Sequence, residues 1–331
     1  MNKQIIVCKP LDSKYTKVAV EMAQDNYNLE KQFVTALGSI DNKAFYQSEI
    51  EKLFKSGIGC IAFQNNEPVG FLAFSQIYDT ITGTMRAISP LYGYGIRNED
   101  RGKVIAHLFQ AAAVELCEKY AQSIRINIYA HDSDVLNMYI MSAFSMDTTE
   151  VVRNTSVHIP AVNMSDFNFA ELDKSQILEY RTDVIELYRN LINHLRVSPV
   201  FYPCNEFLPI EDRFKALLSN DMRIFAVFDN NQLIGMIDTE PTDVEFAKTD
   251  LKAIGMGDVF IKSNFRGCGL GAALLAFANN QIRESGFDRV FVTHGTVNPT
   301  ARRFWDKYFE NYAYTMTRYI VPEMLGIIKM I

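Results

Sequence analysis

The chain has 331 residues, of which 48% are hydrophobic and 22% charged, a composition typical of soluble globular proteins and sufficient for two hydrophobic cores. Its net charge of −6 and its isoelectric point near 5.5 argue against a nucleic acid or an anionic membrane as a partner, and weakly favour a cationic substrate. The N-terminal segment at 1–7 has too short an apolar run for a signal peptide, and no run in the chain approaches the length of a membrane span.

In chain order, the spacing of apolar residues predicts helices at 14–37, 102–120 and 135–144, and again at 176–195, 271–284 and 301–308. Each half of the chain reads as a strand, one or two helices, a meander of strands, and then alternating strands and helices. We therefore predict an α/β fold class, with α+β features, in which each half forms a central mixed β-sheet flanked by helices.

The two halves of the sequence repeat one another. Residues 62–70 (AFQNNEPVG) and 227–235 (VFDNNQLIG) both read as an apolar strand, an Asn-rich turn and a second strand, and they lie 165 residues apart, from 62 to 227. Three further pairs keep this separation to within one residue: Arg101 with Arg266, Asp132 with Asn298, and Tyr139 with Trp305. The repeat predicts a tandem duplication, with domains at 1–162 and 163–331.

The cysteines are scattered along the chain and show no metal-ligand spacing. We therefore expect reduced thiols, no metal site and a cytoplasmic protein. The cysteines are Cys8, Cys60, Cys117, Cys204 and Cys268.

The most informative short segment is RGCGLG at 266–271, between the apolar run at 258–261 and the helix predicted at 271–284. Glycines at a junction from strand to helix let backbone N–H groups point into a shared hollow, and the positive end of the helix dipole adds to them. The segment therefore predicts an anion site, with the charged side chain of Arg266 at its rim. The alternative is a tight turn with no ligand.

Two other glycine-rich phosphate loops compete for this segment. A Walker-type loop requires Gly-Lys-Ser/Thr, whereas Gly271 is followed by two alanines, so we reject it. A dinucleotide fingerprint fits better, because Gly267, Gly269 and Ala272 match its spacing and Asp288 follows 21 residues after Gly267, from 267 to 288. Five residues separate the predicted strand from Gly267, however, and too little chain follows Asp288 to complete a doubly wound sheet.

The segment closely resembles the Arg/Gln-x-x-Gly-x-Gly/Ala signature of the GNAT superfamily of N-acetyltransferases, matching every fixed position. A second family motif, Asn-x-x-Ala-x-x-x-Tyr, begins at Asn298 and Ala301 but has Trp305 in place of the tyrosine. The resemblance implies that each half is a GNAT-like unit and that the second binds acetyl-CoA as a co-substrate. The residues implied to bind it are Phe260, Ile261, Arg266, Gly267, Cys268, Gly269, Leu270, Gly271, Ala272, Asn298 and Trp305.

The first half has lost the open loop that the second half keeps. Val104 stands at the position of Gly269, and the acidic residues Glu99 and Asp100 precede the loop. At an effective dielectric constant near 20, a like-charge pair about 4 Å apart is unfavourable by roughly 4 kcal/mol before screening, which opposes a phosphate. Alternatively, the two acids simply complement the dipole of the following helix. We predict a degenerate N-terminal unit.

The resemblance implies direct attack of a neutral amine on the acetyl thioester. Asp258 is the expected general base, with Glu240, Asp238 and His294 as alternatives. Since Trp305 cannot donate a proton to sulfur, Tyr308 is a substitute acid. Tyr139, in the first half, occupies the position where the family often has this acid, although a packed, buried tyrosine is the alternative.

We therefore expect an N-acetyltransferase that acts on an amine of a small molecule or peptide, with one active and one degenerate unit. A non-catalytic acyl-CoA-binding or regulatory protein is the main alternative, and a protein with two active sites is another. We expect no nucleic-acid or membrane partner. The identity of the acceptor and the oligomeric state, monomer or homodimer, stay open at this stage.

Overall fold

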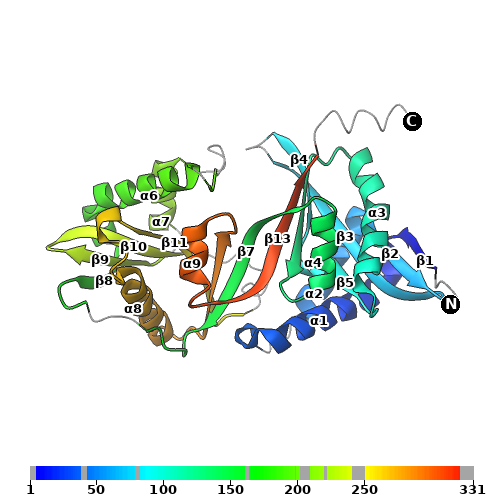
Figure 1. Ribbon diagram of the computed structural model, residues 1–331, viewed down its shortest axis with the longest axis horizontal. Helices are drawn as coiled ribbons and strands as arrows, with labels where there is room; N and C mark the ends of the chain where they lie inside the picture. Colours follow the sequence, from blue (N-terminus) through cyan, green and yellow to red (C-terminus); the bar gives the residue numbers. More distant parts are fainter. Residues whose placement is uncertain are drawn as a thin grey trace. The chain divides into compact units, whose positions relative to one another are not determined.

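A computed structural model of the protein describes residues 5–38, 43–79, 83–160, 164–197, 199–201, 209–219, 222–240 and 250–320 (Figure 1). The chain divides into two compact units. Unit 1 comprises the described residues up to Glu150 and those from Asn311 onward, and unit 2 comprises Val151–Glu310. Each unit has a sheet with parallel and antiparallel neighbours and helices packed on it, so the predicted fold class is confirmed.

Unit 1 contains a sheet in the order β1-β2-β3-β4-β6-β13, and β5 also pairs with β3. Strands β4 and β6 run parallel, while β13 pairs antiparallel with β6. Its elements are β1 (Ile6–Pro10), α1 (Thr16–Phe33), α2 (Lys43–Ser56), β2 (Ile58–Gln64), β3 (Glu67–Asp79), β4 (Thr84–Ser89), β5 (Tyr94–Ile96), α3 (Arg101–Glu118), β6 (Ser123–Tyr129), α4 (Ser133–Met141), the first part of β7 (Ser145–Asn154) and β13 (Glu310–Tyr319).

Unit 2 contains a sheet in the order β12-β11-β10-β9-β8, with the end of β7 beside β12. All neighbours from β8 to β11 are antiparallel, and β11 and β12 are parallel. Its elements are β8 (Asn168–Leu172), α5 (Lys174–Glu179), α6 (Arg181–Arg196), α7 (Ile210–Ser219), β9 (Ile224–Asp229), β10 (Gln232–Glu240), β11 (Ala253–Ile261), α8 (Leu270–Glu284), β12 (Arg289–Gly295) and α9 (Pro299–Trp305).

Both faces of the unit 2 sheet are covered, with α6 and α7 on one side and α8 on the other (Figure 1). The core under α8 includes Leu274 and Ile282, at the apolar spacing that predicted this helix. The core under α6 and α7 includes Leu187 and Phe214. Alternation along β11 sends Ile261 to the first core and Phe260 to the second, so neither side chain is free to line a cleft.

Equivalent turns and strand registers accompany the sequence repeat. Two-residue Asn-Asn turns join β2 to β3 and β9 to β10, and all four asparagines have φ between +46° and +68°. Asparagine tolerates this left-handed conformation better than most residues, which explains both Asn pairs. Beyond the turns, Gly70 pairs with Ile96 in unit 1 and Gly235 pairs with Ile261 in unit 2, a register that repeats after 165 residues.

The compact units differ from the two sequence repeats at their last strands. Residues of β13 from Ala313 to Tyr319 pair with β6 of unit 1, although they end the second repeat. Residues from Val151 onward, which end the first repeat, belong to unit 2. A division at 162/163 therefore follows the sequence repeat and differs from the packing units, and the boundary itself lies outside the described residues.

Helix boundaries differ from the predicted ones at several places. The helix predicted at 14–37 ends at Phe33, and the one predicted at 176–195 is divided into α5 and α6 at Tyr180. The sequence analysis allowed a second helix after the first strand of each half but gave no residue range for it. These second helices are α2 and α7. The strand equivalent to β11 is interrupted in unit 1, where a short 3-10 turn at Leu91–Gly93 separates β4 from β5.

Candidate functional site

The loop at 266–271 joins β11 to α8 in unit 2 and presents an uninterrupted row of backbone donors. Gly267 and Gly269 have φ of +84° and +96°, which side-chain-bearing residues rarely adopt, and Gly269 is the N-cap of α8. The five N–H groups from Gly267 to Gly271 have no acceptor in the described part of the chain. Free N–H groups together with the helix dipole are suited to an anion, and the anion site that the sequence predicted stays a prediction.

Gly271 serves the loop differently, through close packing. A Cβ at this position would lie 3.3 Å from Cε2 of Phe304 and 3.5 Å from Cδ1 of Ile261, so the missing side chain lets the start of α8 approach α9 and β11. Cys268 in the same loop is exposed, and its Sγ–H donates to the carbonyl of Phe265. Leu270 is buried in the core, so it can offer a ligand only its backbone.

Arg266 is turned back onto the strand. Its Nε donates to the carbonyl oxygen of Ile261 at 2.7 Å, and its guanidinium lies 4.6 Å from the centroid of the Phe260 ring. Partial burial lowers the pKa of Arg266. The prediction that the charged side chain of Arg266 lies at the rim of the anion site is therefore wrong. Arg266 instead holds the loop against β11. The equivalent Arg101 does the same in unit 1, donating to Ile96 at 2.8 Å.

Strand β11 separates from β12 and then carries a bulge. Ile237 pairs with Val259 but Thr239 pairs with Met256, so Gly257 and Asp258 together face the single residue Asp238. On its other edge, β11 pairs with β12 only from Ala253 to Gly255. The remainder of β11, which leads to the loop, therefore has one edge without a strand partner in the β11–β12 register.

Asp238 binds the bulge from β10. Its Oδ1 accepts the backbone N–H of Asp258 at 2.6 Å, and its Oδ2 accepts the hydroxyl of Tyr188, from α6, at 2.5 Å. Burial raises the pKa of Asp238 to about 6, although the Tyr188 hydrogen bond and the charge of Arg213 oppose the shift. Burial likewise raises the pKa of Tyr188. Asp238 is thus a buried carboxyl group whose pKa lies well above that of an ordinary aspartate.

Asp258, the expected base, forms an ion pair with Arg213 of α7. The Arg213 guanidinium also lies 4.8 Å from the centroid of the Tyr188 ring. Tyr188 and Arg213 were not among the predicted site residues, because they come from two helices whose only sequence signal is amphipathic periodicity. Sequence reasoning thus found the two aspartates of this cluster but missed the two residues that hold them.

The other expected acids and bases lie elsewhere in unit 2. His294 on β12 is buried, its Nε2 is 3.5 Å from Oδ1 of Asp306, and burial lowers its pKa. The Tyr308 ring packs edge-on against Phe304, which in turn lies against the loop at Gly271. Glu240 ends β10, and its side chain lies outside the described part of the structure.

Two expected cofactor contacts have structural roles. Trp305 is only 3% exposed and packs edge-on against Phe304 and Phe309, so its indole fills the core and cannot lie along a cofactor. The Oδ1 of Asn298 caps α9 by accepting the N–H groups of Thr300 and Ala301 at 3.1 and 3.2 Å. Ala272 lies in the first turn of α8, next to the loop.

The equivalent loop of unit 1 is closed by its own side chains. Asp100 is the N-cap of α3 and accepts the N–H of Lys103 at 3.3 Å, while Asn98 accepts the N–H of Asp100 at 2.8 Å. A carboxylate of the protein thus accepts the N–H of Lys103, whose equivalent in unit 2, the N–H of Cys268, is free. Val104 is completely buried, at the position of Gly269.

Unit 1 also has an ion pair where unit 2 has an uncharged residue. Asp132, equivalent to Asn298, accepts from Nε of Arg101 at 3.0 Å and from the Tyr94 hydroxyl at 3.2 Å. Tyr139 is completely buried between Phe109 and Phe144, and its hydroxyl has no partner among the described residues. Our expectation that Tyr139 acts as the acid is thus wrong, because its own core encloses it.

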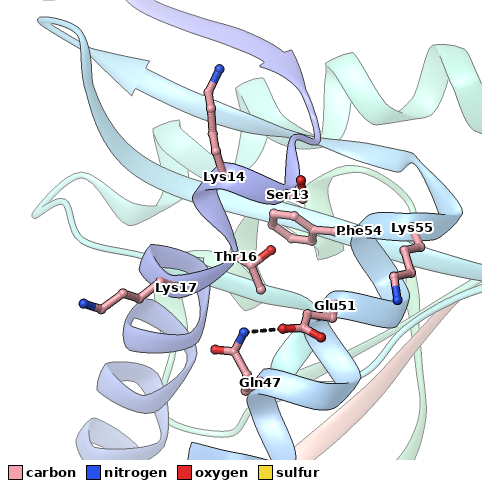
Figure 2. Close-up of a pocket in the computed structure, with 8 residues that line it drawn as sticks. All are labelled: Ser13, Lys14, Thr16, Lys17, Gln47, Glu51, Phe54 and Lys55. Atoms are coloured by element: carbon pink, nitrogen blue, oxygen red, sulfur yellow. Dashed lines mark hydrogen bonds between the residues drawn. The ribbon is translucent and has the colours of Figure 1, made fainter.

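A separate pocket of about 550 Å³ lies in unit 1 between α1 and α2. Three lysines line it, but Figure 2 shows Lys14 and Lys17 extending away from it, so their charges do not converge. Lys14 is instead paired with Asp12 at 2.7 Å, and Gln47 donates to Glu51 inside the pocket. This pocket includes no residue of the predicted site.

Two further expectations concern metals and membranes. Within the described ranges, no group of three or more His, Cys, Asp or Glu residues is arranged to hold a metal ion. In those same ranges, no helix combines the length and apolar character that crossing a membrane requires. The thiols of Cys8, Cys60, Cys117 and Cys268 are free, and Cys204 lies outside the described residues.

Comparison with known families matches residues 189–310 to the acetyltransferase (GNAT) family. This segment contains the bulged strand, the glycine loop and the helix after it. Residues 189–310 form a GNAT domain. The match ends where unit 2 ends, and the family's chemistry is acyl transfer.

Solved structures extend the likeness of fold to the whole chain. A GCN5-related N-acetyltransferase from Sphaerobacter thermophilus is 11% identical, with 96% of each chain covered and a TM-score of 0.58. A glucosamine N-acetyltransferase region of a fungal multi-domain GH3 β-N-acetylglucosaminidase is 14% identical, with a TM-score of 0.51 over 96% of this chain and 38% of that one. No curated protein sequence matches significantly. At such identities these structures establish the fold, including that of unit 1.

Proposed function

We propose that the GNAT domain of unit 2 binds acetyl-CoA and transfers its acetyl group to an amine. The observation that carries this proposal is the row of five free N–H groups from Gly267 to Gly271 at the start of α8. A pyrophosphate is an anion of suitable size to accept several such donors at once. The unpaired edge of β11 leads to this loop and supplies backbone groups for the acyl chain.

In the proposed reaction, a neutral amine nitrogen attacks the carbonyl carbon of the thioester. A C–N bond forms, the C–S bond breaks, and the electron pair leaves with sulfur as a thiolate that takes up a proton. Backbone N–H groups at the end of β11 would stabilise the negative charge that develops on the carbonyl oxygen. Asp258 is the proposed base for the amine, and Tyr308 is the proposed acid for sulfur.

The cofactor proposal predicts one CoA per chain. Gly269→Val, which copies Val104 of unit 1, should weaken CoA binding by at least about tenfold, because a β-branched residue resists φ near +96° and covers the donors. Isothermal titration calorimetry measures the affinity and the stoichiometry. The matched control is Gly286→Val, a similarly strained change at φ +90° at the other end of α8.

Two results would contradict the cofactor proposal. One is a Gly269→Val protein that is folded and binds CoA as tightly as the wild type. The other is a titration that reaches two equivalent sites, because that result would place a second CoA outside unit 2.

A non-catalytic acyl-CoA-binding protein is the second candidate function. Two observations support it. Asp258, the expected base, is already paired with Arg213, and the indole of Trp305, which cannot protonate sulfur, stands at the family's tyrosine position. Release of free CoA thiol from acetyl-CoA in the presence of an amine panel separates the two functions. Tight CoA binding without release of thiol for any amine would favour the binding protein.

A further inference from the structure

A charged cluster interrupts the apolar face that the unit 2 sheet presents to α6 and α7. The core around it contains residues such as Leu187, Phe214 and Met236. Within this surface, Tyr188, Arg213, Asp238 and Asp258 contact one another through the hydrogen bonds, ring contact and ion pair described above. Burial of charged groups is costly, so an unused cluster of this kind would be unfavourable compared with apolar packing.

The members of the cluster differ in their access to solvent. The Arg213 and Asp258 side chains are 27% and 26% exposed, whereas Asp238 is 1% exposed. The arginine and Asp258 therefore form the accessible surface of the cluster, and Asp238 and Tyr188 form its support. Nε of Arg213 is buried and has no hydrogen-bond partner among the described residues, so the exposed part of this side chain consists of its other atoms.

The position of the pair is fixed by the bulge of β11. Asp258 is one of the two bulge residues, and its backbone N–H is held by Asp238. Just before the bulge, β11 ends its pairing with β12. An acyl chain lying along the free edge of β11, as proposed above, would therefore end next to Asp258 and Arg213.

We propose that Arg213 and Asp258 together recognise an acceptor that is a zwitterion, an α-amino acid whose carboxylate pairs with Arg213 and whose ammonium group pairs with Asp258. A neighbouring cation and anion on the protein complement the neighbouring anion and cation of such a molecule. Arginine is suited to this role because its planar fork can bind a carboxylate with two parallel hydrogen bonds. This inference rests on the proposed acetyl transfer.

The protons balance in the following way. Asp258 accepts one proton from the bound ammonium group and passes it to solvent. The resulting neutral nitrogen attacks the acetyl carbonyl, the C–N bond forms and the C–S bond breaks. The second nitrogen proton leaves as the amide forms, and the departing thiolate takes up one proton. The products are the N-acetyl amino acid, free CoA thiol and one proton released to solvent.

The experiment compares matched acceptors in the full-length protein. Each standard amino acid is assayed beside its α-carboxamide and its decarboxylated amine, with thiol release from acetyl-CoA as the readout. For at least one amino acid we expect kcat/KM to be roughly 10- to 100-fold higher than for its α-carboxamide and its decarboxylated amine, both of which lack the carboxylate. This factor corresponds to the loss of one hydrogen-bonded charge pair.

The variant Arg213→Gln should abolish this preference, lowering kcat/KM for the amino acid by a clearly larger factor than for the decarboxylated amine, which also depends on Asp258 but has no carboxylate to lose. Arg213→Lys keeps the charge without the planar fork and should retain part of the preference. The control is Arg181→Gln, because Arg181 pairs with Glu211 of α7 and lies over the ring of Phe214, yet belongs to no part of the cluster. CoA titration and thermal unfolding check that each variant is intact.

The outcomes separate this inference from the proposed function. Amines without a carboxylate reacting as fast as amino acids would overturn the zwitterion assignment and leave acetyl transfer standing. The assignment is also wrong if Arg213→Gln lowers the rates of amino acids and amines by the same factor. If no acceptor releases thiol although CoA binds, both acetyl transfer and its acceptor assignment fail.

Discussion

Asp238 is the residue on which the geometry of the candidate site depends most. Its two carboxylate oxygens accept hydrogen bonds from the N–H of Asp258 and from the hydroxyl of Tyr188. Because both oxygens act as acceptors, these two bonds favour the ionised form of Asp238. In a protonated Asp238, one of the two oxygens would carry a proton and would donate a hydrogen bond where it now accepts one. Its burial nevertheless favours the neutral form, which is why its pKa is raised to about 6.

The raised pKa predicts how stability changes with pH. Because the folded pKa lies above the unfolded value of 3.8, the contribution of Asp238 to stability is fully present below pH 3.8 and is lost as pH rises through about 6. Between pH 5 and 7.5 the wild type should therefore lose roughly 1 kcal/mol more than Asp238→Asn does. Urea unfolding of both proteins at the two pH values measures the difference.

Leu233→Met is a suitable reference for that comparison, because it alters a buried residue of the same strand without changing any charge. Its loss of stability between the two pH values should equal that of the wild type. If the pH dependence of Asp238→Asn also coincides with that of the wild type, Asp238 is not the titrating group.

At the level of single residues, the sequence predicts the loop well and the cluster poorly. Gly267 and Gly269 are readable because positive φ leaves glycine as the residue of choice. Trp305 was misassigned, because an aromatic residue at helical spacing reads the same whether it faces a ligand or the core. Arg213 lies 45 residues before Asp258, from 213 to 258, and no local motif connects them.

At the level of elements, the starts of α3 and α8, two helices at equivalent positions of the sequence repeat, differ in how they are capped. Helix α8 begins at Gly269 without a side-chain cap, which costs stability but keeps its donors free. Helix α3 begins at Asp100, whose carboxylate accepts the N–H of Lys103. The acidic residues before α3 were expected to oppose a phosphate or to complement the helix dipole. The structure gives Asp100 a third role, that of a cap.

This cap predicts a difference between two neighbouring acids. Asp100→Ala should destabilise unit 1 by about 1 kcal/mol, since it removes a hydrogen bond to an otherwise free helix donor. Glu99→Ala, at an exposed position without a hydrogen bond in the described structure, should change stability by less than about 0.5 kcal/mol. Neither change should affect CoA affinity. Chemical denaturation and calorimetry test both points, and equal stability losses would refute the capping role.

Element boundaries were less predictable than element types. The helix at 176–195 is divided at Tyr180, where a capping box at Asp173 and Gln176 starts a short first helix. The apolar spacing continues across this break, so periodicity alone reads one helix. The hairpins at Asn65 and Asn230 were located correctly, because a two-residue turn fixes both its sequence and its register.

At the scale of the whole molecule, the chain enters unit 2 within β7 and leaves it at the start of β13. The sequence could not reveal this, because each last strand has the same alternating pattern whichever sheet it joins. Residues 151–160 are integral to unit 2: Val151 and Ile159 lie in its core, and Asn279 donates to the carbonyl of Thr155 at 2.9 Å. In unit 1, the hydroxyl of Tyr312 on β13 bonds to Glu150.

The division into units predicts which fragment is stable on its own. A fragment of residues 151–310 should unfold at a higher temperature than one of residues 163–331, and should bind CoA. The fragment that starts at 151 keeps two buried aliphatic side chains and the hydrogen bonds of Thr155 with Phe287 and Asp288. Together these contacts contribute on the order of 5 kcal/mol to its free energy of unfolding. The fragment from 163 lacks these contacts and carries β13 without β6, its partner in unit 1. Differential scanning calorimetry with and without CoA compares the two. If the fragment from 163 is the more stable, the last strands belong energetically to their sequence repeats.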